Sequence, residues 1–329
     1  MSFDLQHIRH LAALHGPVAR VVIAEVAGSA PREVGAAMVV WPDGQDGTIG
    51  GGALEYEAAA RARAMLAEGA EARLDRMPLG PALAQCCGGA VTLVSEIWDE
   101  VRLQALGAPL VARALPGKSS DMPLAVSRAL SNARGQGILP AARIVQGWFL
   151  EPLAKPTRDI WIWGAGHVGR ALVSVLVPHS DFKLTWIDVS EDRFPDVSQE
   201  VVALISTDMA ATMAAAPPAA EHMVMTFSHA LDLEICHQAL LHGAQTIGLI
   251  GSATKWARFR SRLAALGHSA DAISRITCPI GNPELGKHPQ AIAIGVAGEL
   301  MQRRARTSPA QTSPDSDGMG SEKAHRGTK

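Results

Sequence analysis

The sequence predicts an α/β protein with two domains, and three observations support that prediction. At 329 residues the chain is long enough for two domains that each bury their own core. An apolar run at 160–163 leads directly into the glycine motif GAGHVG at 164–169 and an apolar helical segment, the layout of a Rossmann-like parallel sheet. Residues 1–105 mix short β-branched runs with helical segments and lack this layout, so we expect a separate mixed α/β domain there.

Composition and charge exclude several classes of protein. The net charge of −2 offers no basic surface for nucleic acid. No uncharged apolar run approaches the roughly 20 residues that span a bilayer, and the first residues lack the pattern of a secretory signal. Four cysteines, two of them adjacent, do not form a disulfide framework. We therefore expect a cytoplasmic protein with free thiols that binds neither nucleic acid nor membrane.

The N-terminal domain is expected to begin with a helix at 3–14, ended by Gly16 and Pro17, and strands at 18–26 and 36–41. A helix at 53–68 follows the run Gly50, Gly51 and Gly52. Glycines that open a helix expose its unpaired N–H groups, which predicts an anion site. The alternative is a flexible turn, because no P-loop lysine follows.

A cysteine loop, defined here as residues 80–89, lies between apolar strand-like segments at 72–79 and 90–98. It contains Gln85, Cys86, Cys87 and Gly88. Glycine lets the backbone approach a ligand closely, and a thiolate is both a soft metal ligand and a nucleophile. The alternative is that both cysteines fill space in the core beside a tight turn. The residues alone leave these two interpretations open.

Residues 106–157 are rich in glycine and proline and only weakly periodic. They predict a connecting region with short strands near 122–130 and 146–150, followed by a proline-containing linker at 151–156. The predicted domains are therefore 1–105 and 158–302. The tail at 303–329 is polar and rich in serine and proline, which predicts disorder.

The C-terminal domain carries the dinucleotide-binding pattern. Gly164, Gly166 and Gly169 follow the first strand, and a second strand at 183–187 ends at Asp188, which could accept a hydrogen bond from a ribose hydroxyl. His167 places a bulky side chain inside the phosphate loop. Further strands are expected at 201–205, 222–227 and 246–250, and helices at 231–242 and 289–302.

A second glycine loop precedes a helix at 254–266. Ser252 and Lys255, with the free N–H groups of that helix, predict a phosphate seat, and the alternative is a capped helix with a solvated basic face. His229, Asp232 and Cys236 fall on one helical face, but core and cap roles are commoner for such residues than a metal triad. Cys278, which precedes a proline, is expected to be buried rather than reactive, and Arg32 is either an anion clamp or a surface residue.

Five segments together resemble the XdhC/CoxI family. They are GSAPR at 28–32, GTIGGGALE at 47–55, QCCGG at 85–89, GAGHVG at 164–169 and IGLIGS at 247–252, and CPIG at 278–281 with GKHP at 286–289 adds to the match. The likeness covers about residues 1–100 and 158–302. It implies an N-terminal XdhC/CoxI-type domain and a C-terminal Rossmann-like domain.

The resemblance also implies a function. Family members are non-catalytic chaperones that bind molybdenum cofactor (molybdopterin), hold it while a NifS-type cysteine desulfurase supplies its terminal sulfur, and deliver it to apo xanthine dehydrogenase. The expected partners are therefore xanthine dehydrogenase, the desulfurase and the proteins of molybdenum cofactor biosynthesis. Cys86 and Cys87 would contact the molybdenum, and a glycine loop would hold the phosphate. A homo-oligomer is compatible with this function, although no heptad pattern argues for one.

The alternative function is that of an NAD(P)-dependent oxidoreductase built on residues 158–302. The glycine motif and Asp188 favour it. No acid–base set is evident near the expected nicotinamide position, and this function leaves residues 1–100 without a role. We therefore expect no enzymatic activity. A third possibility is that the Rossmann-like domain binds NAD(P) or another nucleotide as a structural or regulatory ligand.

Overall fold

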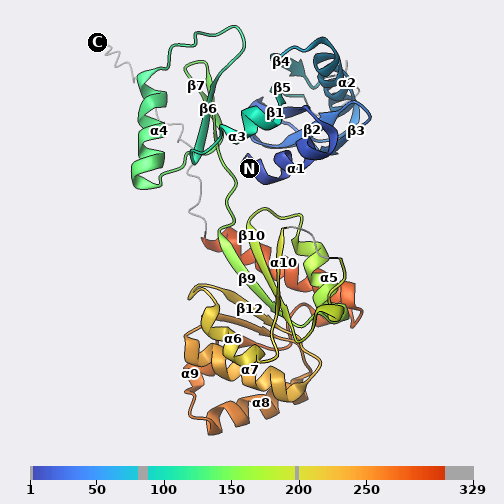
Figure 1. The fold of residues 1–329 in the computed structure, drawn as a ribbon, viewed down its shortest axis with the longest axis vertical. Coiled ribbons are helices and arrows are strands. Elements are labelled where there is room, and N and C mark those ends of the chain that lie inside the picture. The colour runs from blue at the N-terminus through green and yellow to red at the C-terminus, as the bar shows by residue number, and fades with distance from the viewer. Residues whose placement is uncertain (1–2, 81–87, 197–199, 308–329) are drawn as a thin grey trace, which may run out of the picture. The chain divides into compact units, whose positions relative to one another are not determined.

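The computed structural model describes residues 3–80, 88–196 and 200–307 (Figure 1). The chain divides into two compact units, Met1–Pro156 and Thr157–Lys329. Each unit has buried hydrophobic clusters of its own. No helix in the described ranges is long and apolar enough to cross a membrane.

The first unit contains a five-stranded antiparallel sheet in the order β3-β2-β1-β5-β4. Its central strand β1 is buried on both faces, because alternate side chains along a strand point to opposite sides. Val21 and Ile23 pack with helix α2, whereas Val18 and Val22 pack on the opposite face. The elements are α1 (Leu5–His15), β1 (Val18–Ala27), β2 (Ala37–Trp41), β3 (Gly44–Gly47), α2 (Gly52–Glu68), β4 (Ala72–Pro78) and β5 (Ala90–Trp98).

Residues 106–156 belong to this unit and form more regular structure than their sequence predicts. They carry β6 (Leu110–Ala114), α4 (Leu124–Gln136), β7 (Arg143–Val145) and β8 (Trp148–Pro152), and α3 (Glu100–Gln104) precedes them. The strands pair as an antiparallel sheet in the order β6-β8-β7. The strand predicted at 122–130 is wrong, because this segment lies largely in α4. Its apolar side chains Val126, Leu130 and Ala133 recur at helical spacing and pack against β6 and β8.

The second unit is built on a six-stranded parallel sheet in the order β11-β10-β9-β12-β13-β14. Numbered along the chain, the order is 3-2-1-4-5-6, which confirms the predicted Rossmann-like sheet. The point where the order reverses lies between β9 and β12. The strands are β9 (Arg158–Trp163), β10 (Phe182–Asp188), β11 (Val201–Ile205), β12 (Glu221–Val224), β13 (Thr246–Leu249) and β14 (Ile276–Thr277).

Helices cover both faces of this sheet. Ile160 and Ile162 of β9 face α5 (His167–Leu176) and α10 (Pro289–Thr307), whereas Trp161 and Trp163 face the cluster that includes α7 (His229–His242) and α8 (Ala253–Ala265). Figure 1 shows α7 and α8 grouped on the side away from α5 and α10. The remaining elements are η2 (Glu191–Arg193), α6 (Met209–Thr212), η3 (Met213–Ala215), α9 (Ala270–Ile273) and η4 (Pro283–Leu285).

Helix α10 runs to Thr307, beyond its predicted end at 302. The first five residues of the predicted tail are therefore helical, and the prediction of disorder from residue 303 is wrong for them. The rest of the predicted tail, 308–329, lies outside the described residues.

Candidate functional site

The glycine motif at 164–169 forms the turn between β9 and α5, at the carboxyl edge of the parallel sheet. Gly164 has a φ of 118°, and a side chain there would overlap the carbonyl oxygen of Met225. A side chain at Gly169 would overlap the carbonyl oxygen of Gly164, so this glycine lets α5 pack closely against the end of β9. A side chain at Gly166 would meet nothing within 4 Å. Gly166 is therefore the motif position that is open to a ligand.

Asp188 ends β10 and its side chain is turned back onto the glycine motif. Its Oδ2 accepts a hydrogen bond from the Ala165 N–H at 2.5 Å, and its Oδ1 accepts one from the Val189 N–H at 2.7 Å. Arg193 Nε lies 2.7 Å from the same Oδ1, as an ion pair. Asp188 is only 1% exposed. Its carboxylate is therefore engaged within the protein at the position where a ribose would be recognised.

His167 is exposed and lines a cavity of about 370 Å³. The cavity lies between the first turns of α5 and the start of α10. It is therefore lined by the GAGHVG motif and by the GKHP segment, which are far apart in the sequence. Arg170 brings a positive charge to the cavity, with its Nε and Nη2 already donating to the carbonyls of Ala165 and Arg193. The two histidines add ring nitrogens, and together these groups suit an anion. The lining residues are His167, Arg170, Ala171, Ser174, His288, Pro289 and Gln290. His288 was missed as a candidate, although its segment was part of the resemblance.

Ser252 and Lys255 are both used within the fold. Ser252 caps α8 by accepting a hydrogen bond from the Lys255 N–H at 3.2 Å. Lys255 Nζ donates to Asp232 Oδ2 at 2.6 Å and to the Ile250 carbonyl at 2.8 Å, and the residue is 9% exposed. These contacts count against the predicted phosphate seat at this loop.

The proposed face of His229, Asp232 and Cys236 is not a metal triad. Asp232 is buried and also accepts hydrogen bonds from the Thr226 N–H at 2.9 Å and hydroxyl at 2.7 Å. Burial raises the pKa of the Cys236 thiol, and His229 is exposed. Within the described part of the chain, no group of three or more His, Cys, Asp or Glu residues could hold a metal ion.

Cys278 is half-buried, as is consistent with an inert thiol. Burial raises its pKa to about 11, although the nearby Lys255 opposes that shift. A thiol with this pKa is protonated at neutral pH, and the thiolate is the form that binds metals and attacks electrophiles. Neither Cys236 nor Cys278 therefore offers a ready thiolate.

In the first unit, a carboxylate already binds part of the glycine turn that precedes α2. Glu55 Oε2 accepts hydrogen bonds from the Ile49 N–H at 3.0 Å, the Gly51 N–H at 3.1 Å and the Thr48 hydroxyl at 2.5 Å. Partial burial alone would raise the pKa of Glu55, but these hydrogen bonds outweigh it and lower the pKa. The carboxylate thus takes part of the place that the sequence offered to a phosphate, at the Gly51 N–H.

Gln85, Cys86 and Cys87 lie outside the described residues, but both ends of the cysteine loop are described. The Leu79 N–H donates to the Gly89 carbonyl at 2.8 Å, so the loop leaves and re-enters the sheet at neighbouring points of β4 and β5. Gly88 is exposed, and a side chain there would meet nothing within 4 Å.

The neighbours of these loop ends are the other glycine motifs of the unit. A side chain at Gly89 would overlap the backbone around Ser29, and one at Gly28 would press on the Gly89 Cα. A side chain at Gly50 would in turn overlap the ring of Pro31. Arg32, next to it, forms an ion pair with Glu33 at 3.4 Å. The segments at 28–32, at 47–52 and at the two ends of the cysteine loop therefore meet at one end of the strands of the five-stranded sheet.

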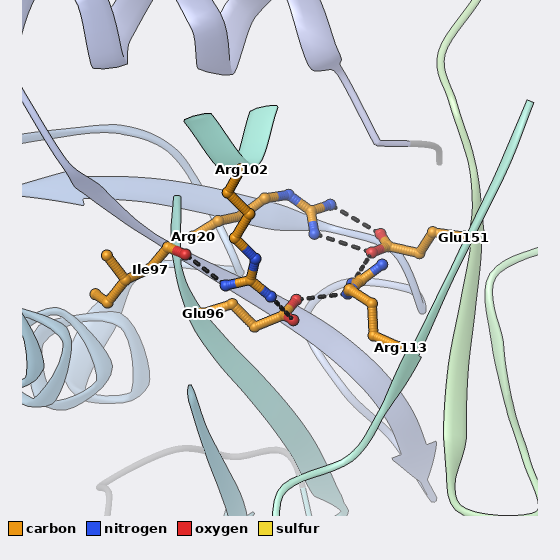
Figure 2. A network of polar contacts seen from close by, with 6 residues as sticks. All are labelled: Arg20, Glu96, Ile97, Arg102, Arg113 and Glu151. Carbon is orange, nitrogen blue, oxygen red and sulfur yellow. Dashed lines mark hydrogen bonds and ion pairs between the residues drawn. The ribbon is translucent and has the colours of Figure 1, made fainter. Parts of the chain in front are cut away.

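A buried ionic network, which the sequence did not predict, joins the two sheets of the first unit (Figure 2). Arg20 of β1 makes two hydrogen bonds to Glu151 of β8, at 2.8 and 3.0 Å. Arg113 of β6 bonds to Glu151 at 2.5 Å and to Glu96 of β5 at 2.7 Å. Arg102 of α3 adds a bond to Glu96 at 3.0 Å.

The network lowers the pKa of the Glu151 carboxyl. Complete burial alone would raise the pKa of Glu151, but the attraction of Arg20 and Arg113 outweighs burial and lowers the pKa. Arg113 also lies over the rings of Phe149 and Phe3, at 5.2 and 5.8 Å from their centroids. The pairs connect β1 and β5 of the five-stranded sheet to β6 and β8 of the three-stranded sheet.

Two family models match the chain. Residues 11–76 match the model described as "XdhC and CoxI family", and residues 160–300 match "XdhC Rossmann domain". No curated protein matches the chain.

Among solved structures, a crystal structure from Bacillus halodurans described as a xanthine dehydrogenase is 20% identical, with a TM-score of 0.66 over 94% of this chain and 98% of its own. At this identity the likeness shows the fold alone. A Rossmann-fold NAD(P)-binding family protein from Shigella flexneri is 13% identical over 34% of this chain and 63% of its own, with a TM-score of 0.28. A short-chain dehydrogenase/reductase from Veillonella parvula in complex with NADP is 16% identical over 43% and 64%, with a TM-score of 0.26. The last two scores are too low to support an argument.

Proposed function

Because the chain belongs to the XdhC and CoxI family, we propose that it serves the maturation of xanthine dehydrogenase as a chaperone for molybdenum cofactor. It would bind the cofactor as cargo, hold it while a NifS-type cysteine desulfurase adds the terminal sulfur, and pass it to apo xanthine dehydrogenase. The observation that carries the proposal is that the segments at 28–32 and 47–52 meet the two ends of the cysteine loop at one end of the five-stranded sheet.

We assign the molybdenum contact to Cys86 and Cys87. Thiolates are soft ligands that suit a molybdenum centre, and the neighbouring glycines allow a bulky cargo to approach the backbone. The two other cysteines of the chain are poor alternatives, because burial raises the pKa of both. Gln85 and Gly88 flank the pair and would complete the contact surface.

The second unit offers a phosphate a candidate seat of its own at the GAGHVG turn, whereas before α2 Glu55 already accepts hydrogen bonds from the N–H groups of Ile49 and Gly51. Gly166 leaves its backbone accessible, and the cavity beside it presents Arg170, His167 and His288. A phosphate monoester is a strong acceptor of hydrogen bonds from such groups.

The second candidate function remains that of an NAD(P)-dependent oxidoreductase, and the strand order 3-2-1-4-5-6 is the observation that favours it. Against it stand the burial of Asp188 and its engagement by Arg193. We therefore propose an accessory role without hydride transfer. A turnover of NADH or NADPH with a small carbonyl substrate that Asp188→Ala abolishes would establish the oxidoreductase instead.

The proposal is tested by purifying the full chain from a host that makes molybdenum cofactor. Metal is measured by elemental mass spectrometry and pterin by the fluorescence of its oxidised form. We expect near one equivalent of each per chain. Cys86→Ala and Cys87→Ala should lower molybdenum retention more than pterin retention, and Cys278→Ala is the matched control that should change neither. Full retention in the Cys86→Ala/Cys87→Ala variant would refute the site.

A further inference from the structure

In the second unit, side chains from the loops after β10 and β12 meet across the carboxyl ends of the parallel strands, and we call this region the crevice. In a dinucleotide-binding fold the ligand lies at the carboxyl ends of the strands, where the strand order reverses, and the acid that ends the second strand binds the ribose hydroxyls. In this protein that acid is Asp188, and the reversal lies at β9 and β12. What surrounds Asp188 therefore decides whether a dinucleotide can bind.

Arg193 covers Asp188. Its Nε lies 2.7 Å from Asp188 Oδ1, and Asp188 is 1% exposed. The backbone of Arg193 is fixed from α5, because its carbonyl accepts a hydrogen bond from Arg170 Nη2 at 2.6 Å. Arg193 is itself half-buried. It is the last residue of η2, whose first two residues, Glu191 and Asp192, are exposed. The guanidinium thus lies against the carboxylate that would bind a ribose.

Phe227 extends this cover across the crevice. The Arg193 guanidinium carbon lies 4.8 Å from the centroid of the Phe227 ring, within the range of a cation–π contact. Arg193 follows β10 and Phe227 follows β12, and these strands flank β9 on opposite sides. Their contact therefore passes over the end of β9, where the motif beginning at Gly164 lies.

We propose that Arg193 and Phe227 close the ribose-binding position of the crevice, so that this unit excludes dinucleotides although it keeps their glycine motif. A ribose could reach Asp188 only if the guanidinium left both the carboxylate and the aromatic ring. Removal of Arg193 would uncover an acid that already has the position to accept ribose hydroxyls. The inference goes beyond the proposed function and does not depend on the cargo.

The test is titration of the purified full chain with NADH and, separately, with NADPH, followed by the fluorescence of the reduced nicotinamide. We expect the unaltered protein to bind both more weakly than about 1 mM. Arg193→Ala should bind NADH at least about tenfold more tightly. Arg258→Ala removes an exposed arginine from α8 of the same unit and should change nothing.

Phe227→Ala is the second variant, because Phe227 is 64% exposed and its loss leaves the core intact. It should also tighten NADH binding, by a smaller factor, since it removes the aromatic support but leaves the guanidinium beside Asp188. Tight NADH binding by the unaltered protein would overturn the inference, and so would an unchanged affinity in both variants. Binding of NADPH that Arg193→Ala abolishes would also overturn it, because Arg193 would then be a ligand for the 2′-phosphate. None of these outcomes bears on molybdenum retention.

Discussion

Glu55 changes how the glycine run before α2 is interpreted. Three glycines before a helix suggest a site for a ligand anion, yet the carboxylate one turn into the helix accepts hydrogen bonds from the N–H groups of Ile49 and Gly51. The position of Glu55 is visible in the sequence, four residues after Gly51. Its rotamer is not, and the rotamer decides whether the N–H groups are free.

We predict that Glu55→Gln destabilises the first unit by about 1 kcal/mol, because a neutral amide is a weaker acceptor at a helix N-terminus than a carboxylate. The measurement is the free energy of unfolding from urea titration. Glu57→Gln is the matched control, since it removes only an ion pair with Arg61 within the same helix. That change should cost less than about 0.5 kcal/mol. Equal effects of the two substitutions would contradict the role of Glu55.

His222 gives the second unit a dependence on pH. It is fully buried, and its Nδ1 accepts a hydrogen bond from Trp163 Nε1 at 3.2 Å. Burial, with a smaller contribution from His242, lowers its pKa from 6.5 to about 4. Between these values the unfolded chain binds more protons than the folded one, so stability is present above pH 6.5 and is lost as the pH falls towards 4.

We therefore predict that the second unit loses roughly 3 kcal/mol of stability between pH 7 and pH 4 through His222. The measurement is the free energy of unfolding by urea at several pH values. His222→Asn keeps an acceptor near the Nδ1 position but does not titrate, so its stability should fall less steeply. Parallel curves for the two proteins would show that His222 does not cause the dependence.

At the scale of the element, the turn between β9 and α5 contains one glycine that the fold requires and another that is open to a ligand. A side chain at Gly169 would overlap the Gly164 carbonyl, whereas one at Gly166 would meet open space. We predict that Gly166→Val leaves the circular dichroism and thermal midpoint nearly unchanged but lowers pterin retention several-fold, because its side chain would keep a phosphate away from the backbone. Gly169→Ala should instead destabilise the second unit by about 1–3 kcal/mol. Normal pterin retention in Gly166→Val would exclude this turn as the phosphate seat.

The elements of the second unit were the more predictable ones. Buried parallel strands read as short apolar runs such as 160–163, and each is followed by a glycine or a helix cap. Helix α4 was missed because its surroundings are rich in glycine and proline, although Val126, Leu130 and Ala133 have helical spacing. For the candidate site, the sequence does not show that Ser252, Lys255 and Asp188 contact other parts of the protein. No pattern along the chain reveals which partner a side chain finds.

On the scale of the whole molecule, the buried network of the first unit is the clearest case of what sequence cannot supply. Arg20 and Glu151 lie in different sheets and far apart along the chain, yet they make two hydrogen bonds with both side chains nearly inaccessible. From the sequence alone, each of these residues would be interpreted as a solvent-exposed charged residue of a strand. Only the packing of the three-stranded sheet against β1 brings them together, so periodicity contains no signal for the pair.

The network and the separate cores predict how the whole chain unfolds. The chain forms two compact units, each with its own hydrophobic clusters, so we expect two transitions in urea, monitored by circular dichroism. Glu151→Gln should shift only the transition of the first unit, by about 3–5 kcal/mol, because it leaves Arg20 buried without its counter-charge. Glu100→Gln, on the exposed face of α3, is the matched control and should shift neither transition by more than about 0.5 kcal/mol.

A second variant separates the charge from the packing. Arg20→Met/Glu151→Met removes both members of the pair and leaves Arg113 with Glu96, so it should recover much of the stability that Glu151→Gln loses. If the double variant is as unstable as Glu151→Gln, the residues matter for their shape rather than their charge. His222→Asn should alter only the other transition, since that residue lies in the second unit. A single transition that responds to substitutions in both units would mean that the units unfold together.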